Sequence, residues 1–483
     1  MSALLAACVL SAVPGQPWQP PPDGEAVEEG APAEPVSTEE GSVGEEESED
    51  DELTERVRQL EEELAATKRA QAAEQEKQSL LDRFRVKLGG YVDVGFFAVQ
   101  GNGAGVRKDV ERDFPEYSDI LSTWVLVGDP LGTTINSRGD VADLGDSRAI
   151  RFDPVHSQGR PTFLVNNVNL SLSASVGDDF SVQVLMDFLP RFRDVSDPAG
   201  VFVGDYLAVK LAWARYHHRF GWGSLAVFAG KVDSILGVEY RTQEAPQRLT
   251  ITPSLICRYT CGRPLGVMAF GTFFKNWLEV ALGLTNGSQQ VETFPFSNEV
   301  DWNRFKTGTG RLALRLPVGK KLEVNVSGAV GPQDKQPDDA VLQWHFGVAA
   351  LWEWNEWLVS AEFVTGRANG KDGVVNGDAV PCAAAACLVY RGAYGQVGWF
   401  GLPVVAPYLR VDWRAADMRD GRSWAYVSEA VRFTAGVNAR LHAYVLLKAE
   451  YVVNRQLLTS EAVTGKSLEF PDDVFTSSLV VAF

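Results

Sequence analysis

The stretch LVNNVNLSLSASVGDDFSVQVLMDF, from Leu164 to Phe188, decides the fold class of this chain. Its first half alternates leucine or valine with asparagine or serine, and its second half alternates in the same way from Phe180 onward. Only the tripeptide Gly177–Asp179 separates the two halves. A period of two predicts strands with one apolar face, and so short a connection predicts an antiparallel hairpin.

The same alternation recurs from residue 84 to the end of the chain. Clear examples are the segments 84–100, 322–330, 342–348, 409–413, 431–437 and 474–483. About sixteen such segments can be counted, within about two either way. The sequence therefore predicts an all-β fold, a transmembrane antiparallel β-barrel of about sixteen strands over residues 84–483.

Connector lengths favour this barrel over a soluble β-sandwich, whose strands also alternate. Long connections fall near 101–161, 190–204, 236–262, 286–307, 331–341, 366–388, 415–424 and 456–473. Short connections include 177–179, 275–276, 318–321, 355–356 and 401–403. Long and short connections alternate, as a membrane barrel with long outer loops and short periplasmic turns requires. Trp354, Trp357 and Trp399 lie beside short turns, where a barrel places its interfacial aromatic residues.

The last strand, 474–483, ends on an aromatic residue. Phe475, Leu479, Val481 and Phe483 share one face of it. The pattern resembles the C-terminal signature of bacterial outer-membrane proteins. We therefore expect Phe483 to serve as an assembly signal for the barrel-assembly machinery.

Composition excludes a helical membrane protein and gives no sign of a nucleic-acid partner. The mean hydropathy is −0.10, and no stretch reaches the roughly 18 apolar residues that a membrane-spanning helix needs. Of the net charge of −18, about −15 lies in residues 1–80, so the rest of the chain is nearly balanced.

The N-terminal region divides into three predicted parts. Residues 1–15 resemble the apolar core of a signal peptide without its basic start, and Leu5–Cys8 resembles a lipoprotein box that sits too close to the start. Residues 16–51 are rich in Pro, Gly, Glu and Ser, which predicts a disordered acidic linker. Residues 52–82 repeat leucine and valine at helical spacing for about two heptads. This segment is either a weak periplasmic coiled coil or a solvated single helix.

Five cysteines are present, and Cys8 falls in the predicted signal peptide. The others form two close pairs, Cys257 with Cys261 and Cys382 with Cys387. An even number in an exported chain favours disulfides. The spacing also permits a metal site, but no histidine lies nearby in the sequence.

Strand pattern, loop alternation and the terminal Phe483 together resemble the sixteen-stranded bacterial porins, including the phosphate-selective porin O and P type. The resemblance covers roughly residues 84–483. It implies a homotrimer in outer-membrane lipid that passes small solutes. The helix at 52–82 is similar to that of porins with an N-terminal periplasmic coiled coil, some of which contact peptidoglycan.

Charged residues on the predicted inner face are candidates for the lining of a pore. They are the basic residues Arg410, Arg414, Arg432, Arg440 and Lys448, with the acids Asp412 and Glu450. Arg410 and Arg414 are expected to face Arg432 and Arg440 on the next strand. In a wet channel such cations attract anions. The alternative is that each one pairs with an acid and only stiffens the wall.

In general porins the third outer loop folds inward and narrows the pore, and here the resemblance places that loop at residues 236–262. It carries Arg241, Arg248 and Arg258, with the Cys257–Cys261 pair near its end. These charged residues of the loop predict a mild anion preference or none.

An enzyme is not expected, because none of the five histidines sits in a metal or catalytic-triad motif. No cofactor is predicted. The alternative function is a structural outer-membrane anchor, or a component of an envelope machine, whose barrel is plugged by its own loops.

Overall fold

The computed structural model describes residues 84–99, 126–127, 161–188, 207–286, 304–332, 341–420, 424–456 and 473–483. The predicted signal peptide (1–15), acidic linker (16–51) and helix (52–82) lie outside these residues and stay predictions. The chain divides into two compact units, Met1–Arg85 and Val86–Phe483, and the second holds nearly all of the described residues.

Sixteen antiparallel strands form the barrel wall. They are β1 (Phe84–Val99), β3 (Thr162–Val176), β4 (Phe180–Phe188), β5 (Leu207–Phe220), β6 (Gly223–Lys231), β7 (Leu265–Phe273), β8 (Leu278–Thr285), β9 (Thr307–Leu316), β10 (Lys321–Pro332), β11 (Leu342–Trp354), β12 (Trp357–Val375), β13 (Asp378–Trp399), β14 (Val405–Asp420), β15 (Trp424–His442), β16 (Val445–Gln456) and β17 (Val474–Ala482). A two-residue strand, β2 (Leu126–Val127), pairs in parallel with β15.

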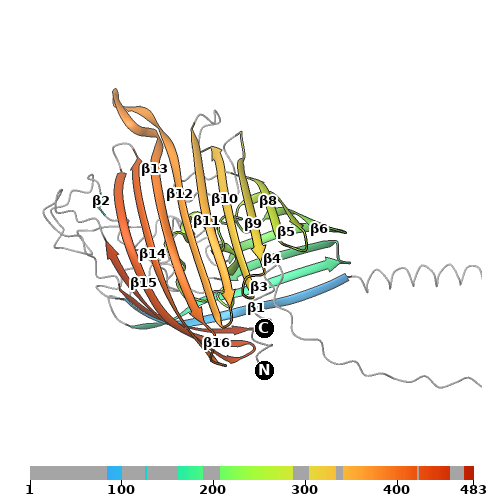
Figure 1. The fold of residues 1–483 in the computed structure, drawn as a ribbon. Helices are drawn as coiled ribbons and strands as arrows, with labels where there is room; N and C mark the ends of the chain where they lie inside the picture. The colour runs from blue at the N-terminus through green and yellow to red at the C-terminus, as the bar shows by residue number, and fades with distance from the viewer. Residues whose placement is uncertain are drawn as a thin grey trace, which may run out of the picture. The chain divides into compact units, whose positions relative to one another are not determined.

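The ring closes because β1 pairs with both β3 and β17. The register of β1 with β17 runs from Tyr91 opposite Ala482 to Val99 opposite Val474. The other strands pair with their neighbours in sequence, as the ribbon shows (Figure 1). A closed sheet leaves no unpaired strand edge, which is the condition for a sheet in hydrocarbon. The predicted sixteen-stranded antiparallel barrel is thereby confirmed.

Side chains alternate between an apolar outside and a polar inside. On β14, Leu409 and Val411 are 58% and 47% exposed, whereas the charged residues Arg410 and Asp412 between them are 2% and 0% exposed. A soluble protein has the opposite arrangement, with its apolar side chains inside. The outer surface is therefore suited to an apolar solvent.

Exposed aromatic side chains lie at the end of the barrel where the short turns are. They include Trp222, Phe274, Trp277, Trp354 and Trp357. The rings of Trp357 and Trp399 lie 6.2 Å apart beside the turn that joins β11 to β12. This belt agrees with the expected aromatic level at one membrane interface. Within the described residues, no helix has both the length and the apolar character to cross a membrane.

Two of the predicted long loops are wrong. The segment 366–388 is a continuous hairpin of β12 and β13, which turns at Asn376 and Gly377 with positive φ. Figure 1 shows this orange hairpin reaching beyond the neighbouring strands. The segment 415–424 is also mostly strand, with only 421–423 between β14 and β15. Both segments are rich in residues that sequence rules assign to loops, but pairing with a neighbouring strand satisfies their backbone and keeps them extended.

Candidate functional site

The chain between β6 and β7, residues 232–264, leaves the wall and folds inside the barrel. We call this segment the inner loop. It contains two short helical turns, η3 (Glu239–Thr242) and α5 (Cys257–Thr260), joined by irregular backbone. Its position agrees with the prediction that the segment 236–262 folds inward.

Apolar side chains of the inner loop contact four separate arcs of the wall. One buried cluster includes residues of β4 to β8, and a second includes residues of β12 to β14. Smaller contacts reach β10 on one side and β1 with β17 on another. The loop side chains in these clusters are Ile235, Leu236, Ala245, Ile256 and Tyr259. Because the arcs are spread around the ring, the inner loop spans the interior instead of lining one side.

Carboxylates of the wall accept hydrogen bonds from the loop backbone. Glu362 of β12 accepts from the Val238 N–H at 2.7 Å, Glu450 of β16 accepts from Ile251 at 2.7 Å and Thr252 at 3.1 Å, and Asp412 of β14 accepts from Leu255 at 3.2 Å. Irregular backbone has few partners of its own when buried, and unpaired groups are costly. These three acids supply those partners.

Cations of the wall donate to the loop carbonyls. Arg410 donates to the carbonyl oxygens of Thr252 and Pro253, both at 2.8 Å. Lys448 donates to Ala245 at 2.8 Å and also to Arg248. The charged groups of the wall therefore fix the path of the inner loop through both its backbone N–H groups and its carbonyl groups.

One ion cluster joins the inner loop to β8, β9 and β10. Arg241 of the loop and the strand residues Arg311 and Arg315 share two carboxylates, Glu279 and Glu323. Arg241 and Arg311 reach Glu323 at 2.7 and 2.5 Å. Three cations around two acids form a network in which each carboxylate is fully engaged.

Glu244 is a second anchor of the inner loop. Tyr91 donates to its carboxylate at 2.6 Å, Arg263 pairs with it at 2.5 Å and Lys210 lies 3.4 Å away. Burial alone would raise the pKa of Glu244, but Lys210 and Arg263 hold it well below the usual value of 4.5. The ionised carboxylate is thus the form that the fold favours.

Replacing this carboxylate, Glu244→Gln, should lower the free energy of unfolding by about 2 kcal/mol at pH 7. A depressed pKa contributes stability above the usual value of 4.5, and this stability is lost as the pH falls toward the folded-state pKa. The difference in the free energy of unfolding between the variant and wild type should therefore become smaller in acid. Urea unfolding in micelles at pH 7 and pH 3 measures it, with Gln247→Ala, an exposed loop position, as the control. A difference that is equal at both pH values would contradict the role of the charge.

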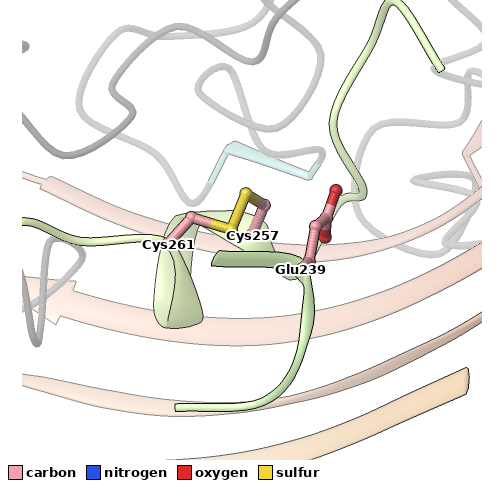
Figure 2. A group of neighbouring side chains, drawn as sticks. All are labelled: Glu239, Cys257 and Cys261. Atoms are coloured by element: carbon pink, nitrogen blue, oxygen red, sulfur yellow. A yellow bond between two sulfur atoms is a disulfide. The ribbon is translucent and has the colours of Figure 1, made fainter. Parts of the chain in front are cut away.

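Glu239, Cys257 and Cys261 lie together in the inner loop (Figure 2), with possible ligand atoms within 4.8 Å of one another. The two sulfurs form a disulfide, so neither is the thiolate that binds zinc. Burial raises the pKa of Glu239, and its carboxylate accepts from the Ser254 backbone at 2.8 Å. The group therefore fits a cross-link that holds α5 and does not fit a metal centre.

The second predicted disulfide, between Cys382 and Cys387, is also present. It lies within β13, where the register with β12 shifts between Lys371 and Gly373, and not in a loop as expected. It closes a stretch of β13 that has more residues than the partner strand opposite. The bridge thus holds an irregular part of the projecting hairpin.

Most of the predicted pore-lining residues are packed against the inner loop. Arg410, Arg414, Arg432 and Lys448 are each at most 2% exposed. Arg414 donates to the Tyr259 hydroxyl at 2.8 Å. Arg410 pairs with Asp412 at 2.9 Å. This agrees with the alternative prediction, in which inward cations pair with acids of the wall. These side chains bond to the inner loop and are largely shielded from water.

The expected row of facing arginines on β14 and β15 is absent. The prediction that Arg410 and Arg414 face Arg432 and Arg440 is wrong, because the register sets Arg410 opposite Thr434 and Arg414 opposite Ala430. Arg432 is opposite Asp412, and Arg440 is exposed at the other end of β15. Arg248 braces the inner loop internally, with a bond to the Ile251 carbonyl at 3.0 Å. The side chain of Arg258 is outside what the structure describes.

Sequence reasoning missed a row of three basic residues on β5. Arg215, His217 and Arg219 face the interior, because Ser181, Ala226 and Ser224 lie opposite them on the inner faces of β4 and β6. None of the three forms an ion pair with a described residue, and Nε of Arg215 is buried without a hydrogen-bond partner. The signal was their spacing of two in the sequence RYHHR, which puts all three on one face.

No protein-family model and no curated protein sequence matches the chain. Solved structures match over 83% of it. The outer membrane channel DcaP of Acinetobacter baumannii is 10% identical over 97% of its own chain, with a TM-score of 0.48. OmpF of Salmonella typhi, in complex with daunomycin, is 11% identical over 98%, with a TM-score of 0.47. An anion-selective porin from Comamonas acidovorans is 12% identical over 100%, with a TM-score of 0.42. The likeness is one of fold.

Proposed function

We propose that this protein is an outer-membrane porin, through which ions and small hydrophilic solutes diffuse passively. The observation that carries the proposal is the wall, a closed ring of sixteen strands with apolar side chains outside and polar or charged ones inside. Such an outside is stable in hydrocarbon, and sixteen strands surround an interior wide enough for water. The inner loop then narrows this interior to a passage for small solutes.

The same wall supports the outer membrane of a Gram-negative bacterium as the location. The short turns and the aromatic belt would face the periplasm, and the longer connections would face outward. Residues 52–82 would then lie in the periplasm. The proposal also includes three features that the porin resemblance implies. They are a homotrimer, recognition by the barrel-assembly machinery and contact with peptidoglycan.

A mild anion preference is proposed to arise at β5. Arg410 and Lys448, two of the cations that were predicted to line the pore, are bonded to the inner loop or to an acid, which leaves little of their field for a passing ion. Arg215 and Arg219 face the interior without an acid partner among the described residues. Unpaired cations in a narrow aqueous passage attract anions and repel cations.

The double substitution Arg215→Gln and Arg219→Gln should lower the chloride-to-potassium permeability ratio roughly two-fold. The reversal potential in a salt gradient across a planar bilayer measures this ratio. The matched control is Lys275→Gln with Lys320→Gln. It removes two positive charges from short turns at the same end of the barrel as Arg219, from residues that are not part of a strand. An equal shift in both double variants would place the selectivity elsewhere.

A plugged barrel that serves as a structural anchor is the second candidate function. The observation that favours it is the reach of the inner loop to four arcs of the wall. Single-channel recording of the purified, heat-modifiable protein separates the two functions. Stable conductance steps in salt would support the porin, and a barrel that inserts but stays silent would support the anchor.

A further inference from the structure

Two arginines lie on the lipid-facing side of neighbouring strands. Arg367 of β12 is opposite Trp344 of β11, and Arg391 of β13 is opposite Ala415 of β14. Both side chains are exposed, and each lies between residues that face the interior, such as the buried Tyr390. On an outer surface made mainly of valine, leucine and phenylalanine, two adjacent cations need a partner.

Strand geometry places Arg367 at the edge of the apolar band and Arg391, which is opposite Thr365 of β12, two residues nearer the short turns. Arg367 follows Trp357, at the short-turn end of β12, by ten residues. At about 3.3 Å per residue and a tilt of about 40°, this corresponds to roughly 25 Å along the barrel axis. The apolar band of such barrels is about 25 Å tall. Arg391 precedes Trp399 by eight residues, which corresponds to roughly 20 Å, and its long side chain can extend the remaining distance. Both guanidinium groups can therefore reach the level of the lipid headgroups on the side away from the short turns.

The neighbouring side chains leave both guanidinium groups available. The Arg391 guanidinium lies 5.5 Å from the ring centroid of Trp413. Glu429 lies in the same row as Arg391, two strands away with Ala415 between them. Its carboxylate is engaged by Trp413, which donates its indole N–H to it at 2.9 Å. Neither arginine forms an ion pair with a described residue.

We propose that Arg367 and Arg391 bind the phosphate of an anionic lipid in the outer leaflet. Two guanidinium forks on adjacent strands match the oxygens of one phosphate, and lysine would not reproduce this geometry. Trp344 and Trp413 frame the site with side chains that prefer the interface. Exposed Phe346, Phe363 and Val411 continue the surface toward the middle of the band, where the acyl chains would lie. The proposal rests on the membrane position proposed above.

The test compares wild type with the double variant Arg367→Gln and Arg391→Gln, both folded in phosphatidylcholine vesicles with or without lipid A. Lipid retained after extraction into detergent is counted by native mass spectrometry. Wild type should retain lipid A, and the variant should retain at least ten-fold less. Arg367→Lys with Arg391→Lys keeps the charge without the fork and should fall between them. Lipid A stripped of its phosphates should not be retained by wild type.

Three results would overturn the proposal. The first is equal retention of lipid A by wild type and the glutamine variant, and the second is equal retention of the dephosphorylated lipid by wild type. The third is a change of oligomer size in the variant with no change in the amount of retained lipid. That result would assign the arginines to contacts between copies of the chain. The lumen variant Arg215→Gln with Arg219→Gln is the control that should retain lipid A as wild type does. Conductance of the same preparations tests the porin function separately, because loss of bound lipid leaves the passage unchanged.

Discussion

Replacing Ile235–Cys261 with a two-residue Asn-Gly turn should raise the single-channel conductance roughly three-fold or more. The ends of the inner loop permit this change, because the Ser234 N–H donates to the Gly262 carbonyl at 2.7 Å and the Val232 N–H donates to Pro264 at 3.0 Å. The two strands are therefore already in hairpin register where the loop begins. The shortened chain would extend β6 and β7 and leave the interior open to water.

The wall should tolerate this excision. Arg410, Lys448 and Glu450 would lose their loop partners but gain water, so no charge would be left both buried and unpaired. Planar-bilayer recording measures the conductance, and a heat-dependent shift in gel mobility shows that the barrel has folded. A folded variant with unchanged conductance would show that the inner loop is not the narrowest part of the passage.

A cross-linked variant tests whether the loop is fixed or mobile. Leu236 packs against Ala329 of β10, so Leu236→Cys with Ala329→Cys would tie the loop to the wall. Because the wall already holds the loop backbone through Glu362, Glu450 and Arg410, the cross-link should leave the conductance as it was. A fall in conductance on oxidation, reversed by reductant, would instead identify a loop that moves.

The barrel was predictable from the sequence because its determinants are local. Alternation fixes which side chains share a face, as in Leu409 to Asp412, and short turns fix which strands pair. Strand ends were less predictable. Residues 366–388 have the Gly, Asn and Asp content of a loop, and only pairing across β12 and β13 shows that the strands continue.

The candidate site was predictable only in part, because alternation gives the direction of a side chain and not what lies opposite it. An inward arginine such as Arg410 gives the same sequence pattern whether its side chain faces water or the inner loop. Its actual contacts, Thr252 and Pro253, are more than 150 residues away in the sequence. The cations on β5 were missed for the same reason, since only the packing of distant segments shows that they have no acid partner among the described residues.

The other large effect is expected at Arg311, whose side chain is completely buried. Arg311→Met should lower the free energy of unfolding by about 3 to 5 kcal/mol, because it leaves Glu279 and Glu323 buried with fewer cations. The control is Arg315→Met on the same strand. Arg315 pairs with the same two acids, but its side chain is 20% exposed, so water can replace it and the loss should be smaller. Urea unfolding in micelles measures both variants.

The inner loop should respond to Arg311→Met as well, because it shares the network. Arg311 donates to the Tyr240 hydroxyl at 3.4 Å, and Arg241 depends on the same Glu323. Adding Glu323→Gln to Arg311→Met removes one of the stranded acids and should restore part of the lost stability. If the double variant were as unstable as the sum of the two single variants, the residues would act independently. The loop would then be held by its backbone bonds to β12, β14 and β16 and not by this network.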